Sequence, residues 1–274
     1  MKEDRMIDQT PSPDEILSLA FQLADVAAEQ TLKWFRAPAL VTQNKWSEGF
    51  DPVTEADKAA ESAMRALLKV RRPEDSIIGE ELHNTTGTSG LSWVLDPIDG
   101  TRGYVSGTPT WGTLIALNDG QEPIFGMIDQ PYIGERFVGG LGMAFMERNG
   151  VKTSLAARKT RHLSQATIFT TFPEVGSPLE AEAFHTLAEQ CQLTRYGMDC
   201  YAYALLAAGQ IDLVIEAGLN AYDIQAPMAL VQAAGGVVSD WRGGNPMNGG
   251  RCVCAATPEL HAAALDILRE VPLG

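Results

Sequence analysis

The order of the predicted elements changes midway along the chain, and this change limits the folds open to it. The first half begins with two helices and continues in strands, whereas the second half alternates strands with helices. Consecutive strands favour antiparallel pairing, while alternation favours a sheet covered by helices. We therefore predict an α/β fold whose N-terminal half is mixed α+β, divided into residues 1–155 and 156–274.

Helix and turn signals place the elements of the first half. Ser12, Pro13 and Glu15 are an N-cap, a first-turn proline and a capping-box glutamate, and apolar residues at helical spacing follow to about residue 35. Thr54 and Asp57 predict a second helix to about residue 70. The predicted strands, which we expect to form an antiparallel sheet, are 76–81, 92–96, 113–118, 124–129 and 135–140, with a hairpin at 149–150.

The second half is predicted to alternate strands and helices from residue 166 onward. Its predicted strands are 166–171, 195–197, 212–217, 236–241 and 252–256. Its predicted helices are 179–191, 200–208, 224–234 and a last helix that begins at Thr257-Pro258. No internal repeat or low-complexity linker separates the two halves.

Composition and charge exclude several classes of partner. The 274 residues carry 21 Lys and Arg against 35 Asp and Glu, a formal net charge of −14. Such a surface repels polyanions, so we expect no nucleic-acid partner, although solubility alone explains most of these carboxylates. No apolar run reaches the roughly 18 residues of a membrane helix, and the N-terminal residues lack a signal-peptide pattern. We expect a cytoplasmic protein with no membrane partner.

Two carboxylates, Asp96 and Asp99, end an apolar strand in the stretch WVLDPIDGTRGY at 93–104. Asp-Pro and Asp-Gly are common in tight turns, so these dipeptides have a purely structural explanation on their own. Other carboxylates also stand at the ends of apolar segments, namely Asp57, Glu80, Glu81 and Asp223. Several anions that meet in space require compensating cations or protonation of some members.

A site built from carboxylates favours magnesium. Oxygen ligands without nearby His or Cys suit Mg²⁺ rather than Zn²⁺. The four histidines have no ligand spacing and are interpreted as surface residues, and the four cysteines as buried free thiols. Gly100 and Thr101 follow the carboxylates, and a glycine turn at a helix start offers N–H groups to a phosphate. Two metals about 4 Å apart can activate a water and stabilise a leaving alkoxide.

These residues resemble the inositol monophosphatase-like family of magnesium-dependent phosphomonoesterases. The family motif W-x-x-D-P-I-D-G-T-x-x-Y is matched at 93–104, and DPVTEAD at 51–57, IGEE at 78–81 and YDIQAPMALVQAAGG at 222–236 support the match. Within the family the chain looks most like the bacterial histidinol-phosphate phosphatase branch, through residues 112–140 and 195–219. The resemblance implies a layered αβαβα sandwich of the sugar phosphatase type, a site between the two halves, and a homodimer.

The resemblance also implies a set of metal ligands. Glu80, Asp96 and the Ile98 carbonyl would hold a first Mg²⁺. Asp96, Asp99 and Asp223 would hold a second, so that Asp96 bridges the two ions. Glu80 would also touch a weaker third ion through water. The family pattern therefore implies two or three Mg²⁺ in each active site.

Further roles around the metals follow from the same resemblance. Thr101 with Asp57 would orient the attacking water, and the N–H groups of Gly100 and Thr101 would bind the phosphate. Lys45 matches a basic residue on the mobile loop of the family. Gln225 departs from the family pattern, which has a small residue at that place, but this departure removes no proposed ligand.

Substrate choice is argued from charge. Inositol is neutral, whereas histidinol carries an ammonium group and an imidazole that can be cationic, so its site should offer carboxylates beyond the metal ligands. Asp199 and Glu216 are the candidates. Glu216 can also accept bonds from sugar or inositol hydroxyls, and Asp199 is also explained as the N-cap of the following helix. Asp199 is therefore the sharper discriminator.

The predicted reaction is hydrolysis of the phosphate monoester L-histidinol phosphate to L-histidinol and phosphate, a step of histidine biosynthesis. Metal-bound water attacks directly, because no motif for a phosphoenzyme nucleophile is present. The alternatives within the family are an inositol-1-monophosphatase and a nucleotide or sugar bisphosphate phosphatase. The bisphosphate alternative needs basic residues, for which Arg195 is the candidate, and a remote alternative is a non-catalytic ligand-binding relative.

Overall fold

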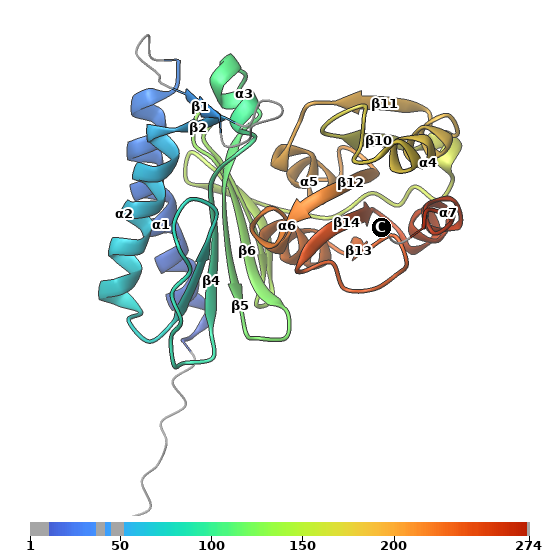
Figure 1. Cartoon of the computed structure of the whole chain (residues 1–274). Helices are drawn as coiled ribbons and strands as arrows, with labels where there is room; N and C mark the ends of the chain where they lie inside the picture. Colours follow the sequence, from blue (N-terminus) through green and yellow to red (C-terminus); the bar gives the residue numbers. More distant parts are fainter. Residues whose placement is uncertain (1–10, 37–41, 45–51, 273–274) are drawn as a thin grey trace, which may run out of the picture.

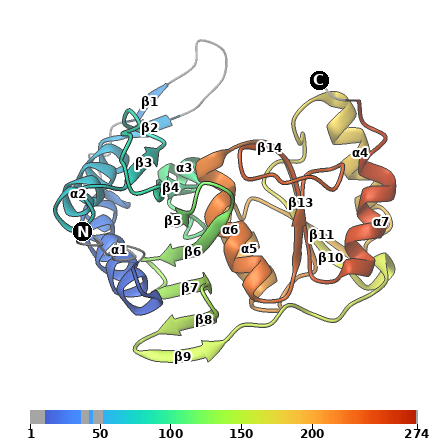
Figure 2. The same ribbon diagram turned by 90° about the horizontal axis from the view of Figure 1, so that it is seen from below.

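Helices and sheets alternate in layers across the molecule (Figures 1 and 2). The computed structural model describes residues 11–36, 42–44 and 52–272. The helices that form the layers are α1 (Pro13–Trp34) and α2 (Glu55–Arg71) on one outer face, α5 (Cys200–Ala207) and α6 (Ala221–Ala233) between the sheets, and α4 (Pro178–Ala188) and α7 (Pro258–Leu268) on the other outer face. This is the αβαβα arrangement that the family resemblance implies.

The larger sheet lies between the α1–α2 layer and the central helices. Its strands, in spatial order, are β3 (Ser76–Gly79), β4 (Ser92–Asp99), β5 (Gly112–Asn118), β6 (Pro123–Gln130), β7 (Glu135–Gly140), β8 (Met143–Arg148) and β9 (Val151–Ser154). The pairs from β4 to β9 are antiparallel, and the hairpin predicted at 149–150 joins β8 to β9.

The pair β3–β4 is parallel, so the expectation of a wholly antiparallel sheet is wrong at this edge. A parallel pair needs a connection of about a dozen residues to bring the chain back to the starting end. Residues 80–91 supply that connection. As a result the chain leaves β3 at the end where β4 carries Asp96 and Asp99.

The smaller sheet is mixed. Its strands, in spatial order, are β11 (Leu193–Tyr196), β10 (Thr167–Thr170), β12 (Leu213–Asn220), β14 (Gly249–Ala255) and β13 (Val237–Ser239). β10 is parallel to β11 and β12, whereas β14 is antiparallel to β12 and β13. Short elements that were not predicted are β1 (Thr42–Asn44), β2 (Pro52–Thr54) and a 3₁₀ helix, η1 (Leu163–Gln165), whereas α3 (Thr101–Ser106) begins at the helix start expected after Gly100.

The apolar runs of the strands are buried on both faces. In β5, Leu114 and Ala116 join the core formed with α5 and α6, whereas Ile115 and Leu117 join the core under α1 and α2. Successive strand residues face opposite sides, so a strand covered on both sides needs apolar residues at every position.

The division into domains at residue 155 stays a prediction. Among the described residues, no helix has both the length and the apolar character needed to cross a membrane.

Helix α6 contacts both sheets and ties the two halves together. Gly126 and Gly139 lie against its backbone, where any Cβ would overlap α6. Gln225, the departure from the family pattern, is only 3% exposed. Its side chain accepts a bond from Asn118 Nδ2 at 2.9 Å and donates to the Met247 carbonyl at 3.1 Å. The buried amide is thus hydrogen-bonded on both sides, as burial requires.

Candidate active site

A bulge in β4 places the two aspartates of the 93–104 stretch together. Asp96 pairs with Leu114 and Asp99 with Gly112, so β4 uses one more residue than β5 over this interval. In a regular strand, residues three apart point to opposite faces, and one extra residue reverses this. Thr113 Oγ1 holds the bulge by donating to the Pro97 carbonyl at 2.8 Å. The prediction that these carboxylates act together is consistent with this local geometry.

Asp96, Asp99 and Asp223 form one acidic cluster, with carboxylate oxygens within 4.8 Å of one another. The first two come from β4 and the third from the first turn of α6. The Asn220 N–H donates to Asp223 Oδ2 at 2.6 Å as part of a capping box, which fixes this carboxylate at the helix start. The Ile98 N–H similarly donates to Asp96 Oδ1 at 3.1 Å.

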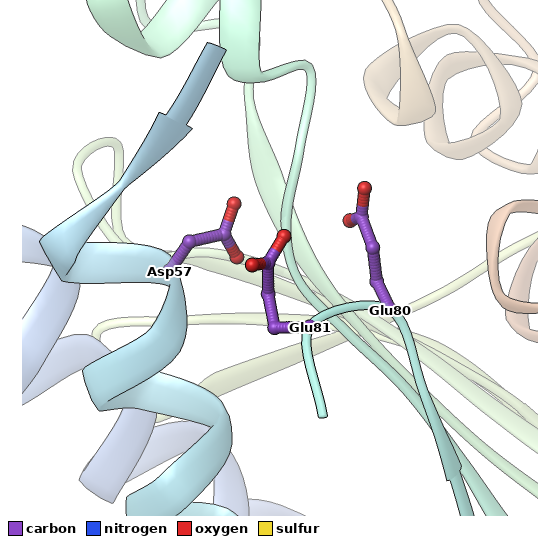
Figure 3. A group of neighbouring side chains, drawn as sticks. All are labelled: Asp57, Glu80 and Glu81. Atoms are coloured by element: carbon purple, nitrogen blue, oxygen red, sulfur yellow. The ribbon is translucent and has the colours of Figure 1, made fainter. Parts of the chain in front are cut away.

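Asp57, Glu80 and Glu81 form a second acidic cluster with the same spacing of at most 4.8 Å. Asp57 comes from the first turn of α2, and the two glutamates follow β3 (Figure 3). Asp57 is 1% exposed. The sequence predicts Glu81 as one of the carboxylates at the ends of apolar segments but assigns it no ligand role; its signal is the Glu-Glu pair directly after the apolar run SIIG.

The two clusters influence each other electrostatically around Asp96. Burial raises the pKa of Asp96 well above its usual range, and the charges of Glu80, Asp99, Asp223 and Asp57 raise it further. Burial likewise raises the pKa of Asp223 to about 6. Carboxylates that oppose one another's ionisation in this way are stabilised by a cation placed among them.

The donor set fits a hard divalent cation. Both clusters consist of carboxylate oxygens, and the carbonyl of Ile98, which lies between Asp96 and Asp99 in β4, accepts from Thr101 Oγ1 at 3.2 Å. Cys200 lies beside Asp99, and its backbone N–H donates to Asp99 Oδ2 at 2.6 Å. Burial, then the charge of Asp99, raises the pKa of the Cys200 thiol, which stays neutral and is a poor metal ligand. Oxygen donors of this kind suit Mg²⁺ or Ca²⁺.

Gly100 and Thr101 lie where β4 passes into α3. Gly100 is the N-cap of this helix, with φ at 85°, and its carbonyl accepts from the Tyr104 N–H at 2.9 Å. Only glycine adopts such a φ without strain. Thr101 is the first helical residue and is partly buried. Lys45, the remaining prediction for the first half, lies outside the described residues.

Asp199 approaches this turn from the second half of the chain. A Cβ built on Gly100 would lie 3.0 Å from both Cβ and Cγ of Asp199, so the two residues are in close contact. Asp199 occupies the N-cap position of α5 with φ at 46°, yet its side chain makes no cap hydrogen bond. Burial raises its pKa to about 6, while the charge of Arg102 opposes that shift. Asp199 therefore stands at the N-cap position, but capping does not explain why an aspartate side chain is needed there.

Glu216 and Arg195, the other predicted substrate residues, differ in their surroundings. Glu216 is 6% exposed, and its carboxylate accepts from the Thr171 N–H at 2.7 Å, from Thr171 Oγ1 at 2.9 Å and from Thr170 Oγ1 at 3.3 Å. Burial raises its pKa to about 7, although the bonds from Thr171 lower it. Arg195 lies on the edge strand β11 and is exposed.

Comparisons with known proteins identify the relatives of this chain. The sequence profile of the inositol monophosphatase family matches residues 12–273. A bifunctional phosphatase IMPL2 of Arabidopsis thaliana is 38% identical over 84% of this chain, which spans 65% of the length of that plant protein. A histidinol-phosphatase of Streptomyces coelicolor is 34% identical over 93% of this chain and 97% of its own length.

A solved structure agrees with these sequence matches. An inositol monophosphatase from Zymomonas mobilis superposes with a TM-score of 0.82 and 38% identity, covering 95% of this chain and all of that one. Both the family profile and the relatives above 30% identity extend over most of the chain. The chain belongs to the inositol monophosphatase family and is a phosphoric monoester hydrolase.

Proposed function

We propose that this phosphatase hydrolyses L-histidinol phosphate to L-histidinol and phosphate in histidine biosynthesis, with Mg²⁺ as its cofactor. The observation that carries the proposal is the contact between Asp199 and Gly100, at the start of α3. Asp199 belongs to neither acidic cluster, so neither proposed set of metal ligands uses its carboxylate. The histidinol-phosphatase of Streptomyces coelicolor, 34% identical to this chain, supports the same substrate.

Glu80, Asp96 and the Ile98 carbonyl would hold one Mg²⁺, and Asp96, Asp99 and Asp223 a second. Glu80 would reach a third through water. When bound, the metal lowers the pKa of a water molecule and neutralises charge on the phosphoryl oxygens. Asp96 is the common member of both ligand sets, and burial with four neighbouring carboxylates raises its pKa, a shift that a bound cation would oppose.

The remaining residues would orient the reactants. Gly100 and Thr101 would donate backbone N–H groups to the phosphate at the start of α3. Thr101 Oγ1 and Asp57 would accept hydrogen bonds from the attacking water and hold it in line with the bond to be broken. Their contribution would be positioning rather than covalent catalysis. Thr101 lies within hydrogen-bond distance of the Ile98 carbonyl, which ties the water-orienting hydroxyl to a proposed metal ligand.

Asp199 would pair with the ammonium or imidazolium of histidinol. Its φ of 46° is unusual for a residue with a side chain, and such conformations cluster at functional sites. Arg102, whose guanidinium lies 4.5 Å from the Phe172 ring centre, opposes the raised pKa of Asp199 and so favours its ionised form. Glu216 is the weaker candidate, because three bonds from Thr170 and Thr171 already engage its oxygens.

Inositol 1-phosphate is the second candidate substrate, since the inositol monophosphatase of Zymomonas mobilis is 38% identical to this chain. A bisphosphate is less favoured, because Arg195 lies at the exposed edge of the smaller sheet. We also propose that the protein is a homodimer, as relatives of the family commonly are, which sedimentation at micromolar concentration tests directly.

A side-by-side assay tests the substrate. Values of kcat/KM would be measured with Mg²⁺ on L-histidinol phosphate, inositol 1-phosphate and 3′-phosphoadenosine 5′-phosphate. We expect a preference for histidinol phosphate, and an Asp199→Asn variant should lose about 10- to 100-fold on it, the value of a charged hydrogen bond. On inositol 1-phosphate the same variant should change little. Equal losses on both substrates, or a wild-type preference for inositol 1-phosphate, would contradict the proposal.

A further inference from the structure

The turn that carries Glu80 and Glu81 is held through its backbone N–H groups. Glu61 Oε2 accepts from the Glu81 N–H at 2.7 Å, and Glu61 Oε1 accepts from the Leu82 N–H at 3.2 Å. The Glu80 N–H donates to the Leu95 carbonyl of β4 at 3.3 Å. A side chain from α2 and a strand of the larger sheet therefore fix the turn from two sides.

Glu61 is fully buried, at 0% exposure, and Arg65 compensates its charge. Arg65 Nε lies 2.6 Å from Glu61 Oε1, and Arg65 Nη2 donates to the Leu82 carbonyl at 3.1 Å. Arg65 thus holds both the carboxylate that binds the turn and the turn itself. A buried carboxylate is stable only with such partners, so the pair acts as one unit.

Gly79, the last residue of β3, is dictated by the same pair. A Cβ at this position would overlap the Glu61 carboxylate and would approach Arg65 Nη2 to 2.8 Å. The carboxylate therefore occupies the space that a side chain would need at the end of the strand. Gly79, Glu61 and Arg65 therefore pack together where β3 ends and the turn that carries Glu80 and Glu81, the acidic turn, begins.

The spacing along α2 connects this arrangement to the proposed metal site. Asp57, Glu61 and Arg65 are four residues apart, and residues at that spacing lie on one face of a helix. Asp57 joins Glu80 and Glu81 in the second acidic cluster (Figure 3), whereas Glu61 reaches the backbone beneath that cluster. One face of α2 thus supplies a member of the cluster and binds the backbone of another member, Glu81, and of the residue after it.

We propose that Glu61 and Arg65 are positioning residues that set the place of the Glu80 and Glu81 carboxylates and thereby the affinity for a divalent cation. This inference rests on the proposed metal site. Outer groups that orient metal ligands typically change metal affinity by about 10- to 100-fold when they are replaced. Glu61→Gln keeps the size of the side chain but replaces one carboxylate oxygen by an NH₂ group. That group then faces an N–H donor whose hydrogen bond the carboxylate accepts in the wild type.

The chain contains a matched control at the opposite end of β3. Asp75 is also buried, at 5% exposure, and accepts from Arg72 Nε at 2.8 Å and from Trp93 Nε1 at 3.0 Å. It directly precedes β3, whereas Glu80 directly follows it. Asp75→Asn therefore disturbs a similar carboxylate–arginine pair without touching the acidic turn.

The test measures Mg²⁺ binding by isothermal titration calorimetry without substrate, beside thermal unfolding of each protein. We expect Glu61→Gln to weaken binding by about 10- to 100-fold, and Arg65→Lys, which keeps the charge, to weaken it less. Asp75→Asn should lower the melting temperature but keep the wild-type affinity. If Glu61→Gln does not fold, the Mg²⁺ affinities of Arg65→Lys and Asp75→Asn are compared instead.

Two outcomes would overturn the inference while the metal site stands. One is a wild-type affinity in folded Glu61→Gln or, in its absence, in Arg65→Lys. The other is an equal loss of affinity in Asp75→Asn, which would reduce the effect to general destabilisation. Wild-type protein that binds no Mg²⁺ would instead overturn the proposed metal site, and this inference with it.

Discussion

At the scale of single residues, the site gathers carboxylates that oppose one another's ionisation. Burial and four neighbouring acidic groups raise the pKa of Asp96, and burial raises that of Asp223 to about 6. Without a cation, such an arrangement lowers the stability of the folded protein at neutral pH. Function at this site is therefore expected to be in conflict with stability of the metal-free form.

Replacing Asp96 separates these two effects. Asp96→Asn should lower kcat/KM by about 10³-fold or more, because both proposed metal positions lose a ligand and with it their stabilisation of the transition state. The same variant should raise the melting temperature of the metal-free protein, since a buried charge is removed. Activity assays with a Mg²⁺ titration check the loss of activity, and calorimetry in chelator checks the rise in melting temperature. Full turnover of Asp96→Asn at high Mg²⁺ would contradict the expected loss of activity.

Glu216 gives a prediction about pH. Its pKa is raised to about 7 in the folded protein, so the folded state binds a proton that the unfolded state has released. Stability from this group is complete below the unfolded pKa near 4.5 and is lost as pH rises to about 7. Between pH 4.5 and 8 the free energy of unfolding should fall by about 3 kcal/mol more in the wild type than in Glu216→Gln. This figure follows from the difference between the folded and unfolded pKa values.

Urea unfolding in chelator at these two pH values measures this loss. Glu216→Gln is a suitable comparison, since its amide can accept from Thr171 and donate to the Thr170 hydroxyl. The other titrating carboxylates are common to both proteins and cancel in the difference. The same dependence of stability on pH in both proteins would show that Glu216 does not titrate as described.

Residue types at strand and helix ends predicted the members of the acidic clusters, but not the groups that hold them. Asp96, Asp99 and Asp223 follow from their positions after apolar segments and from the family motif. Glu61 looks in the sequence like any acidic residue of an amphipathic helix. Its bonds go to the backbone of residues 81 and 82, and backbone partners leave no trace in residue types.

At the scale of elements, the passage from β4 into α3 is the part of the fold that shapes the site. The bulge between Asp96 and Asp99 and the φ of 85° at Gly100 turn the chain within a few residues. Longer elements were predictable because their apolar residues repeat with the period of a helix or strand. For the six-residue helix α3 only the start was predictable, from its glycine turn, because a short helix has no period. The parallel β3–β4 pair was not predictable, since pairing direction depends on distant partners.

Two glycines allow the role of this passage to be measured. Gly100 and Gly90 have φ of 85° and 86°, but a Cβ would crowd Asp199 only at Gly100 and would meet nothing within 4 Å at Gly90. Both Gly→Ala changes should cost about 1 kcal/mol from backbone strain. Only Gly100→Ala should also lower kcat/KM by about tenfold or more, since a displaced reactant or ligand is costly. Equal activities of the two variants would contradict this role.

At the scale of the whole molecule, the proposed site draws on both halves of the chain. The larger sheet supplies Asp96 and Asp99, α2 and the β3 turn supply the second cluster, and α6 supplies Asp223. The layered order was predictable from the change in element pattern together with the family resemblance. The convergence of the carboxylates was predictable only as a consequence of that fold, because it joins residues more than a hundred positions apart.

Cations that bridge the halves should stabilise the whole fold. Mg²⁺ at 100 times its dissociation constant adds about 2.7 kcal/mol, which for a chain of this size raises the melting temperature by roughly 5 °C. The net charge of −14 also responds to general screening, so NaCl of equal ionic strength is the control. The shift should be absent in Asp96→Asn. An equal shift with NaCl would mean that Mg²⁺ acts only by screening.

The most direct measurement is a crystal structure of the protein with Mn²⁺, with anomalous scattering recorded at the manganese edge. The proposed metal site predicts anomalous peaks within coordination distance of Asp96, Asp99 and Asp223, and of Glu80 with the Ile98 carbonyl. Ordered carboxylates at these positions with no anomalous peak among them, or side chains that point away from one another, would contradict it.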